Sequence, residues 1–213
     1  MIKETKLLCY ALLFIAALTG CTGRKETDSV QQYLSWINDP EAGLVQRRQV
    51  NNLLLSVKYL PPQYLASRDR DLSPEGKDSM ARYYSESKAF LLTITPLAAP
   101  DKEPGKSDVM FYDLKDFQEY KQRSHTMNFE MEEYVKLIAG NRTYHPVLSS
   151  LENTYGLEEG RNVYLVFSDD QRGKELNAAA ELDIVFNDEL FSTGLNHFVF
   201  RKEKLDNLPH LIF

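Results

Sequence analysis

The sequence predicts a mainly β fold with helical insertions (α+β), built as a single antiparallel β-sandwich-like domain. Seven or more short stretches have the apolar content or alternation typical of strands, and turn residues separate them at irregular intervals. These stretches do not alternate regularly with helices, which disfavours a doubly wound parallel sheet. With 43% hydrophobic and 26% charged residues, the chain of 213 residues has the composition of one folded domain.

Helix-start signals and helical spacing predict three helices. The first covers residues 29–37, with Ser29 as a candidate N-cap. The second begins with Ser73 as its cap and Pro74 in its first turn, and it runs to about residue 87. The third is capped by Asp113 and extends through residues 117–120.

Strands are predicted where apolar residues alternate or form short runs between turn residues. The predicted strands cover residues 51–60, 90–95, 109–112, 129–137, 143–148, 162–167, 182–186 and 197–200. Glu133 interrupts the apolar face of the fourth of these strands, so we expect a bulge or a sheet edge there. The connections include a loop over 98–107, a hairpin turn at Gly140 and Asn141, and turns at 169–173, 187–188 and 204–208.

The N-terminus combines a basic segment, an apolar run and a cysteine. Two lysines within residues 1–6 precede an apolar run over residues 7–18. This run is shorter than the roughly 20 residues that a membrane-spanning helix needs, so residues 1–20 are predicted to be a signal peptide. The run closes with Leu18, Thr19, Gly20 and Cys21.

This four-residue sequence resembles the lipobox of bacterial lipoproteins. In that family a signal peptidase recognises the residues before the cysteine and cuts there, and the thiol carries the lipid. The resemblance therefore implies lipid attachment at Cys21 and peptidase recognition through Leu18, Thr19 and Gly20. It covers about the first tenth of the chain. Two or more acyl chains anchor a protein stably, whereas one does not.

The same resemblance implies an address in the cell envelope. In these lipoproteins an Asp after the cysteine favours the inner membrane, whereas this chain has Thr22. We therefore expect the outer membrane, with the periplasmic and the cell-surface face both open. Residues 21–28 are expected to form a flexible lipidated tether, followed by one β-rich globular domain over residues 29–213.

Charge and cysteine content exclude several classes of protein. Without residues 1–20 the chain keeps 23 basic and 30 acidic residues, a net charge of −7. An acidic domain without a dense basic cluster is a poor candidate for binding nucleic acid, so membrane contact is expected through the N-terminal lipid alone. Cys9 lies in the signal peptide and Cys21 carries the lipid, so the domain has no cysteine for a disulfide or a metal site.

No motif for catalysis, for a cofactor or for a metal is found. The histidines are not spaced for zinc, and the loop that begins at Asp69 has Pro74 where a calcium-binding EF-hand loop needs glycine. The acidic pairs Asp169–Asp170 and Asp188–Glu189 are interpreted as turn residues, with a weak surface calcium site as the alternative. Nucleophile motifs and glycine-rich phosphate loops are also missing, which disfavours an enzyme.

Aromatic residues give the remaining hint about binding. The chain has 12 Tyr and 11 Phe, most of which are expected in the core. Tyr83 and Tyr84 lie on a helix with little apolar surface, and Tyr112 follows another aromatic residue. These three tyrosines are the candidates for an exposed contact face.

The sequence thus favours a lipid-anchored cell-envelope protein that acts by binding. The leading hypothesis is an accessory or structural subunit of an outer-membrane assembly, with a protein partner in the envelope. The alternative is a ligand-binding surface module, possibly for carbohydrate. A hydrolase with unrecognised carboxylates is the third hypothesis, because the spacing of such carboxylates is set by the fold.

Overall fold

The computed structural model describes residues 25–97, 108–154 and 158–213. The strands are β1 (Glu26–Thr27), β2 (Val45–Val50), β3 (Leu53–Leu60), β4 (Ser87–Pro96), β5 (Val135–Ala139), β6 (Arg142–Tyr144), β7 (Leu148–Leu151), β8 (Arg161–Ser168), β9 (Glu181–Asp188), β10 (Gly194–Arg201) and β11 (His210–Leu211). They form a five-stranded sheet in the order β2-β3-β4-β8-β7 and a four-stranded sheet in the order β10-β9-β5-β6. Both sheets are antiparallel, and a separate parallel pair joins β1 to β11.

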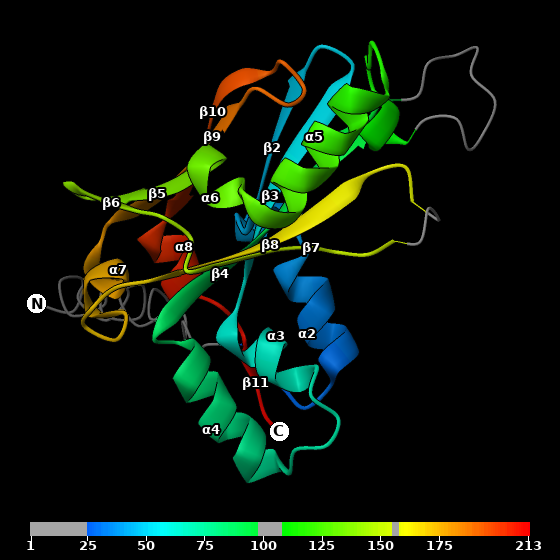
Figure 1. Cartoon of the computed structure of the whole chain (residues 1–213). Coiled ribbons are helices and arrows are strands. Elements are labelled where there is room, and N and C mark those ends of the chain that lie inside the picture. The colour runs from blue at the N-terminus through cyan, green and yellow to red at the C-terminus, as the bar shows by residue number, and fades with distance from the viewer. Residues whose placement is uncertain (1–24, 98–107, 155–157) are drawn as a thin grey trace, which may run out of the picture.

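Helices lie in the connections and around the sheets (Figure 1). They are α2 (Val30–Ile37), α3 (Pro62–Ser67), α4 (Pro74–Tyr84), α5 (Phe117–Phe129), α6 (Met131–Tyr134), α7 (Lys174–Ala178) and α8 (Lys202–Asp206), with short 3-10 helices η1 (Pro40–Ala42) and η2 (Val109–Phe111). The result is a mainly β, sandwich-like single domain with helical insertions, as the sequence predicts.

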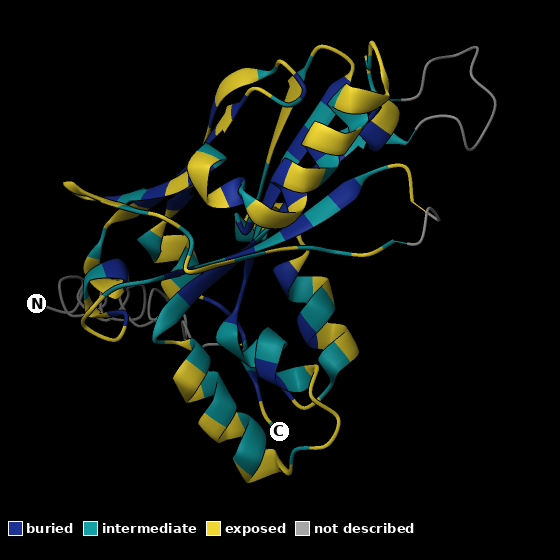
Figure 2. Ribbon diagram, viewed as in Figure 1, coloured by how far each residue is buried: buried dark blue, intermediate teal, exposed yellow. Residues whose placement is uncertain are grey.

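The inner faces of the two sheets supply most of the hydrophobic core. Alternation along β3, β4 and β8 buries residues such as Leu55, Phe90 and Leu165 on one side of the five-stranded sheet. The four-stranded sheet contributes residues such as Ile184 and Phe198 to the same buried cluster. We call the opposite side of the five-stranded sheet its outer face. The dark blue of the strands in Figure 2 follows this inner cluster.

Several local predictions are confirmed. Ser29 caps α2 by accepting a hydrogen bond from the Gln32 backbone, and Ser73 caps α4 in the same way through Gly76. Gly140 has a positive φ of 59° in the tight turn between β5 and β6. The strands predicted at 51–60, 90–95, 162–167, 182–186 and 197–200 correspond to β3, β4, β8, β9 and β10. The loop predicted over 98–107 lies outside the described residues.

Three predictions around α5 are wrong. Residues 109–111 form a 3-10 helix rather than a strand, and Asp116, not Asp113, caps α5 by accepting from two backbone N–H groups. The predicted strand 129–137 is helical as far as Tyr134, and only its last residues form β5. Phe129 is 68% exposed, so the apolar alternation that predicted this strand included a residue that the fold leaves outside.

β2 and α3 are two of the elements that the sequence does not predict. The sequence of β2 is mostly polar because it is the edge strand of its sheet and exposes its central residues. α3 begins at Pro62 directly after its N-cap Pro61, and proline is well accommodated in the first turn of a helix.

The two ends of the described chain are joined by β1 and β11. The His210 backbone N–H donates to the Lys25 carbonyl at 2.7 Å, and the Ile212 N–H donates to the Thr27 carbonyl at 2.8 Å. Thr27 is 7% exposed. Residues 25–28, predicted as part of a flexible tether over 21–28, therefore belong to the fold.

Candidate functional site

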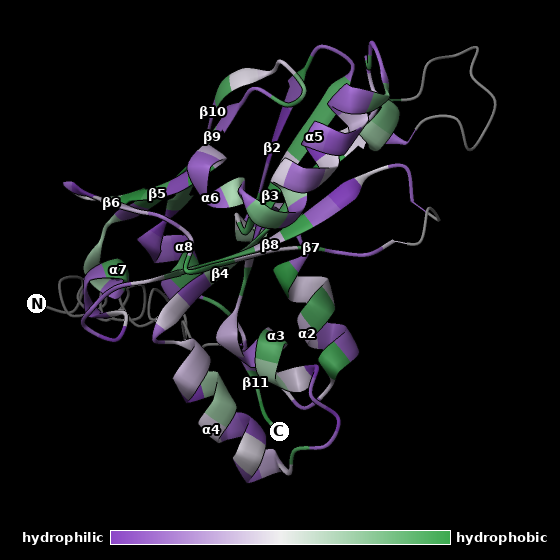
Figure 3. Cartoon of the chain, in the orientation of Figure 1, coloured by the Kyte–Doolittle hydropathy of each residue, from purple (hydrophilic) through white to green (hydrophobic). Residues whose placement is uncertain are grey.

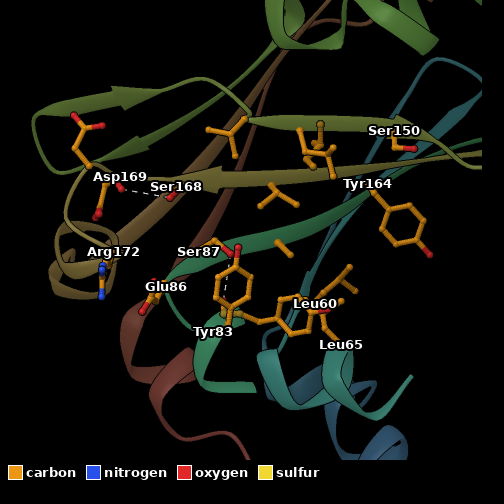
Figure 4. A pocket seen from close by; sticks show the side chains of 17 residues that line it. Leu60, Leu65, Tyr83, Glu86, Ser87, Ser150, Tyr164, Ser168, Asp169 and Arg172 are labelled. Atoms are coloured by element: carbon orange, nitrogen blue, oxygen red, sulfur yellow. Dashed lines mark hydrogen bonds between the residues drawn. The ribbon is translucent and has the colours of Figure 1, made fainter. Parts of the chain in front are cut away.

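A pocket of about 660 Å³ lies on the outer face of the five-stranded sheet. Helices α3 and α4 contact each other and close one side of it, while β4, β8 and β7 form its base (Figure 4). The volume falls within the range of about 300–1,000 Å³ that is usual for ligand sites. We call this the outer-face pocket.

Strand alternation explains the apolar base of the pocket. Residues whose neighbours point into the core turn their own side chains outward, so Ala89, Val166 and Leu148 share the outer face. Val166 pairs with Ala89 on one side and with Leu148 on the other. Leu60 and Leu65 add apolar surface from the end of β3 and from α3.

Helix α4 covers the pocket without being part of the core. None of its residues is buried, which Figure 2 shows as a helix of teal and yellow, and its hydropathy is mixed in Figure 3. Its last two residues, Tyr83 and Tyr84, line the pocket, and their ring centroids are 6.0 Å apart. The two rings are tilted by 58°, so they do not form one flat surface. Tyr83 is 66% exposed.

One end of the pocket is charged. Glu86, Asp169 and Arg172 lie there, next to the start of β4 and the end of β8 (Figure 4). Asp170, which follows Asp169 in the chain, also lines the pocket. Gly173 lets the segment after β8 pack closely against Glu86. A Cβ at position 173 would lie 2.6 Å from the Glu86 carbonyl oxygen, and the φ of +77° also favours glycine.

Asp169 has a structural role at this end. Its carboxylate accepts hydrogen bonds from the backbone N–H groups of Gln171, Gly173, Glu175 and Leu176, at 2.7–3.0 Å. Burial raises the pKa of Asp169, but these four hydrogen bonds together outweigh it and lower the pKa below its ordinary value. Both of its oxygens are therefore occupied, and Asp169 is not placed to act as a general acid or base.

The other end of the pocket is fixed by a tyrosine and an arginine. Tyr164 points from β8 onto the outer face, and its hydroxyl accepts a hydrogen bond from Arg68 at 3.1 Å. Along β8, Ser168 and Tyr164 are four residues apart, so the base of the pocket is about 14 Å long. The pocket thus runs parallel to the strands, from the acidic end at Asp169 to the end at Tyr164 and Arg68.

The side of the pocket formed by β7 is open to solvent. Val147 is 65% exposed and Leu148 is 54% exposed. β7 is the last strand in the order of its sheet, so no further strand covers this side among the described residues.

The structure brings together two of the three predicted contact tyrosines. Tyr83 and Tyr84 both line the outer-face pocket. Tyr112 does not: it packs against the core, and its carbonyl accepts a hydrogen bond from Arg123 of α5, at the opposite end of the molecule from α4 (Figure 1). Leu18, Thr19, Gly20 and Cys21 lie outside the described residues.

The sequence did not indicate the remaining residues of the pocket. Leu148 and Val166 belong to apolar stretches whose outward residues resemble inward ones, and only the strand order shows which face they share. Aliphatic residues at outward positions of these strands could have indicated a binding face, because the solvated face of a sheet is usually polar.

Other titratable groups lie away from this pocket. Lys88 is on the inner face of β4, where burial lowers its pKa to about 8, and its ammonium lies 5.7 Å from the Tyr59 ring centroid. On the four-stranded sheet, His197 lies 2.7 Å from Asp183. Within the described ranges, no group of three or more His, Cys, Asp or Glu side chains is placed to hold a metal ion. No helix in these ranges is both long and apolar enough to cross a bilayer.

The chain has few detectable similarities to known proteins. No protein-family model matches the chain, and no curated protein matches it. The chain is similar to a crystal structure of a protein of unknown function from Burkholderia pseudomallei K96243, with 11% sequence identity over 84% of this chain and 88% of that chain. The TM-score of 0.38 is too low to indicate a shared fold.

Proposed function

We propose that this protein is a lipid-anchored cell-envelope protein that acts by binding. In this proposal it is an accessory or structural subunit of an outer-membrane assembly, and its protein partner occupies the outer-face pocket. No catalytic role is needed, since the carboxylate that the fold positions most firmly at the pocket is used to hold a loop.

The observation that carries the proposal is an open apolar surface with a concave shape. The pocket combines a buried aliphatic base with exposed Tyr83, Val147 and Leu148 at its mouth. Contiguous exposed apolar surface is unfavourable in water and usually marks a binding site. A partner that covers Val147 and Leu148 would remove two largely exposed apolar side chains from water.

The fold connects this pocket to the proposed anchor. β1 begins at Glu26, so only residues 22–25 separate it from Cys21, and five residue steps reach at most about 18 Å. β1 pairs with β11, and the Gln63 side chain of α3 forms hydrogen bonds with both the N–H and the carbonyl of Leu211. The pocket therefore lies in the half of the domain that the anchor would hold near the membrane.

The carbohydrate-binding alternative finds less support. Sugar rings stack on flat aromatic surfaces, whereas the rings of Tyr83 and Tyr84 are tilted by 58°. Tyr164, the third tyrosine of the pocket, uses its hydroxyl to accept from Arg68.

The proposal is tested by particle size in gently solubilised native envelopes. The wild-type protein is expected in a discrete complex larger than a monomer. Leu148→Glu is expected to release a monomer, because it places a charge on the apolar base. Cys21→Ala is expected to leave the protein uncleaved or soluble.

Leu195→Glu is the matched control. Leu195 is a strand leucine with 55% exposure, against 54% for Leu148, and it lies on the other sheet. The control should keep the complex. A monomeric wild-type protein, or equal effects of the two glutamates, would contradict a partner in the pocket; lipid labelling of the Cys21→Ala variant would contradict the anchor.

A further inference from the structure

The open side of the outer-face pocket is the unpaired edge of β7. The register pairs Leu148 with Val166 and Ser150 with Tyr164, and just beyond β7 the Glu152 N–H donates to the Asn162 carbonyl at 2.8 Å. In an antiparallel pair, every second residue bonds its neighbour strand. Residues 148, 150 and 152 therefore bond β8, and the main-chain groups of Ser149 and Leu151 point away from it.

These outward main-chain groups have no partner strand among the described residues. An edge of this kind is a template for another strand. The side chains of Leu148 and Ser150 face the pocket, so a strand added beside β7 would extend the pocket's base by one strand width, about 4.8 Å.

Charge adds a second requirement for the added strand. The Glu86 and Asp170 carboxylates form no ion pair within the described residues, and Arg172 is the basic side chain beside them. Asp169 adds a further negative charge nearby. Excess negative charge at this end favours a basic residue in whatever binds there.

From this geometry we infer that an extended segment of the partner protein adds to β7 as a further strand. Alternate apolar side chains of that segment enter the outer-face pocket, and a Lys or Arg meets the charged end. This mode takes affinity from main-chain hydrogen bonds and specificity from the pocket. The inference rests on the proposed function, because it names how the partner occupies the same pocket.

The test removes one outward N–H group. Ser149→Pro deletes the donor that faces the added strand but leaves the ladder to β8 intact, and proline is tolerated at such edge positions. Ser149→Ala keeps the N–H and is the matched control. In the particle-size experiment, Ser149→Pro is expected to release the monomer and Ser149→Ala to keep the complex.

Hydrogen exchange gives a second measurement that needs no variant. In the wild-type complex, the amides of Ser149 and Leu151 should exchange at least tenfold more slowly than in the isolated protein, because their N–H groups point away from β8. Where the basic residue of the partner is a lysine, carbodiimide crosslinking should join it to Glu86 or Asp170, and mass spectrometry of that crosslink identifies the segment.

The outcomes separate the two proposals. If Leu148→Glu releases the monomer while Ser149→Pro keeps the complex and the Ser149 and Leu151 amides gain no protection, the pocket binds its partner without strand addition, and the inference is wrong. If all these variants keep the complex, the proposed function fails as well. A lipid extracted from the wild-type protein but not from Leu148→Glu would assign the pocket to an amphiphile and overturn the inference.

Discussion

Lys88 is a charged residue that the fold buries to 8% exposure on the inner face of β4. Burial lowers its pKa to about 8, and the nearby charges of Asp206 and Lys202 act in opposite directions. Burial also raises the pKa of Tyr59, whose ring lies next to the Lys88 ammonium. This pair makes stability depend on pH in the alkaline range.

Stability should therefore rise with pH from about 8 to about 10. Below pH 8 Lys88 is charged in the folded and the unfolded protein, and the cost of burial, on the order of 3 kcal/mol, is fully present. Between pH 8 and 10 the unfolded protein binds more protons, so the free energy of unfolding increases. Above pH 10 unfolded Tyr59 loses a proton that the folded protein keeps, and the trend reverses.

Lys88→Met should remove the rise between pH 8 and 10 and stabilise the protein at pH 7 by about 1–3 kcal/mol. Urea unfolding at a series of pH values measures both effects. The exposed Lys136→Met is the control and should keep the wild-type slope. A Lys88→Met protein with an unchanged slope would show that another group titrates.

At this scale the sequence predicts local roles better than tertiary ones. The caps Ser29 and Ser73 follow from the residues next to them in the chain. The burial of Arg123, which donates to the carbonyls of Val109, Met110, Tyr112 and Leu190, depends on segments up to 67 residues away. No local sequence pattern predicts such a contact.

At the scale of elements, the loop from β8 to α7 is held by one carboxylate. Asp169 accepts from four backbone N–H groups, and Gly173 lets the loop approach Glu86. The charged end of the outer-face pocket thus depends on a short segment rather than on the core. Acidic residues at a predicted turn were interpreted correctly, but the number of bonds to one of them was not predictable.

Asp169→Ala should lower the free energy of unfolding by about 1–2 kcal/mol, as loss of a strong helix cap does. Asp170→Ala, at the exposed neighbouring position, should change it by less than about 0.5 kcal/mol. Chemical denaturation compares the two variants. If both variants lose the same free energy of unfolding, the four hydrogen bonds of Asp169 add little to stability beyond the effect of its negative charge.

The elements that sequence patterns mispredict have physical reasons in common. Alternation in 129–137 matched a strand by coincidence, because Met131 reaches the core from a helical turn and Phe129 stays outside. β2 lacked apolar alternation because an edge strand of this kind buries little. Apolar patterns in a sequence indicate which residues are buried, not which are in strands. They therefore mispredict a buried helical turn as a strand, and they miss an edge strand that buries little.

At the scale of the whole molecule, β1 and β11 close the fold. Leu211 is 1% exposed and belongs to the main buried cluster, whereas its neighbour Ile212 is 48% exposed. The same short strand binds β1 on one side and Gln63 of α3 on the other. One buried residue therefore supports both the proposed anchor point and the helix pair over the pocket.

Leu211→Ala should cost about 2–5 kcal/mol, the usual range for a buried leucine. Ile212→Ala should cost much less, since half of that side chain is already in water. Hydrogen exchange should show faster exchange of the β1 amides in the first variant only. If the β1 amides exchange at the wild-type rate in Leu211→Ala, the burial of Leu211 does not stabilise the pairing of β1 with β11.

The parallel pair also sets an order of events in time. Glu26 pairs with His210, about 180 residues further along the chain, so β1 cannot form until nearly all the described chain has been synthesised. Until that moment Glu26 and Thr27 have no β11 to pair with. The first described residues therefore join the fold last, when residues 210–212 fix them in place.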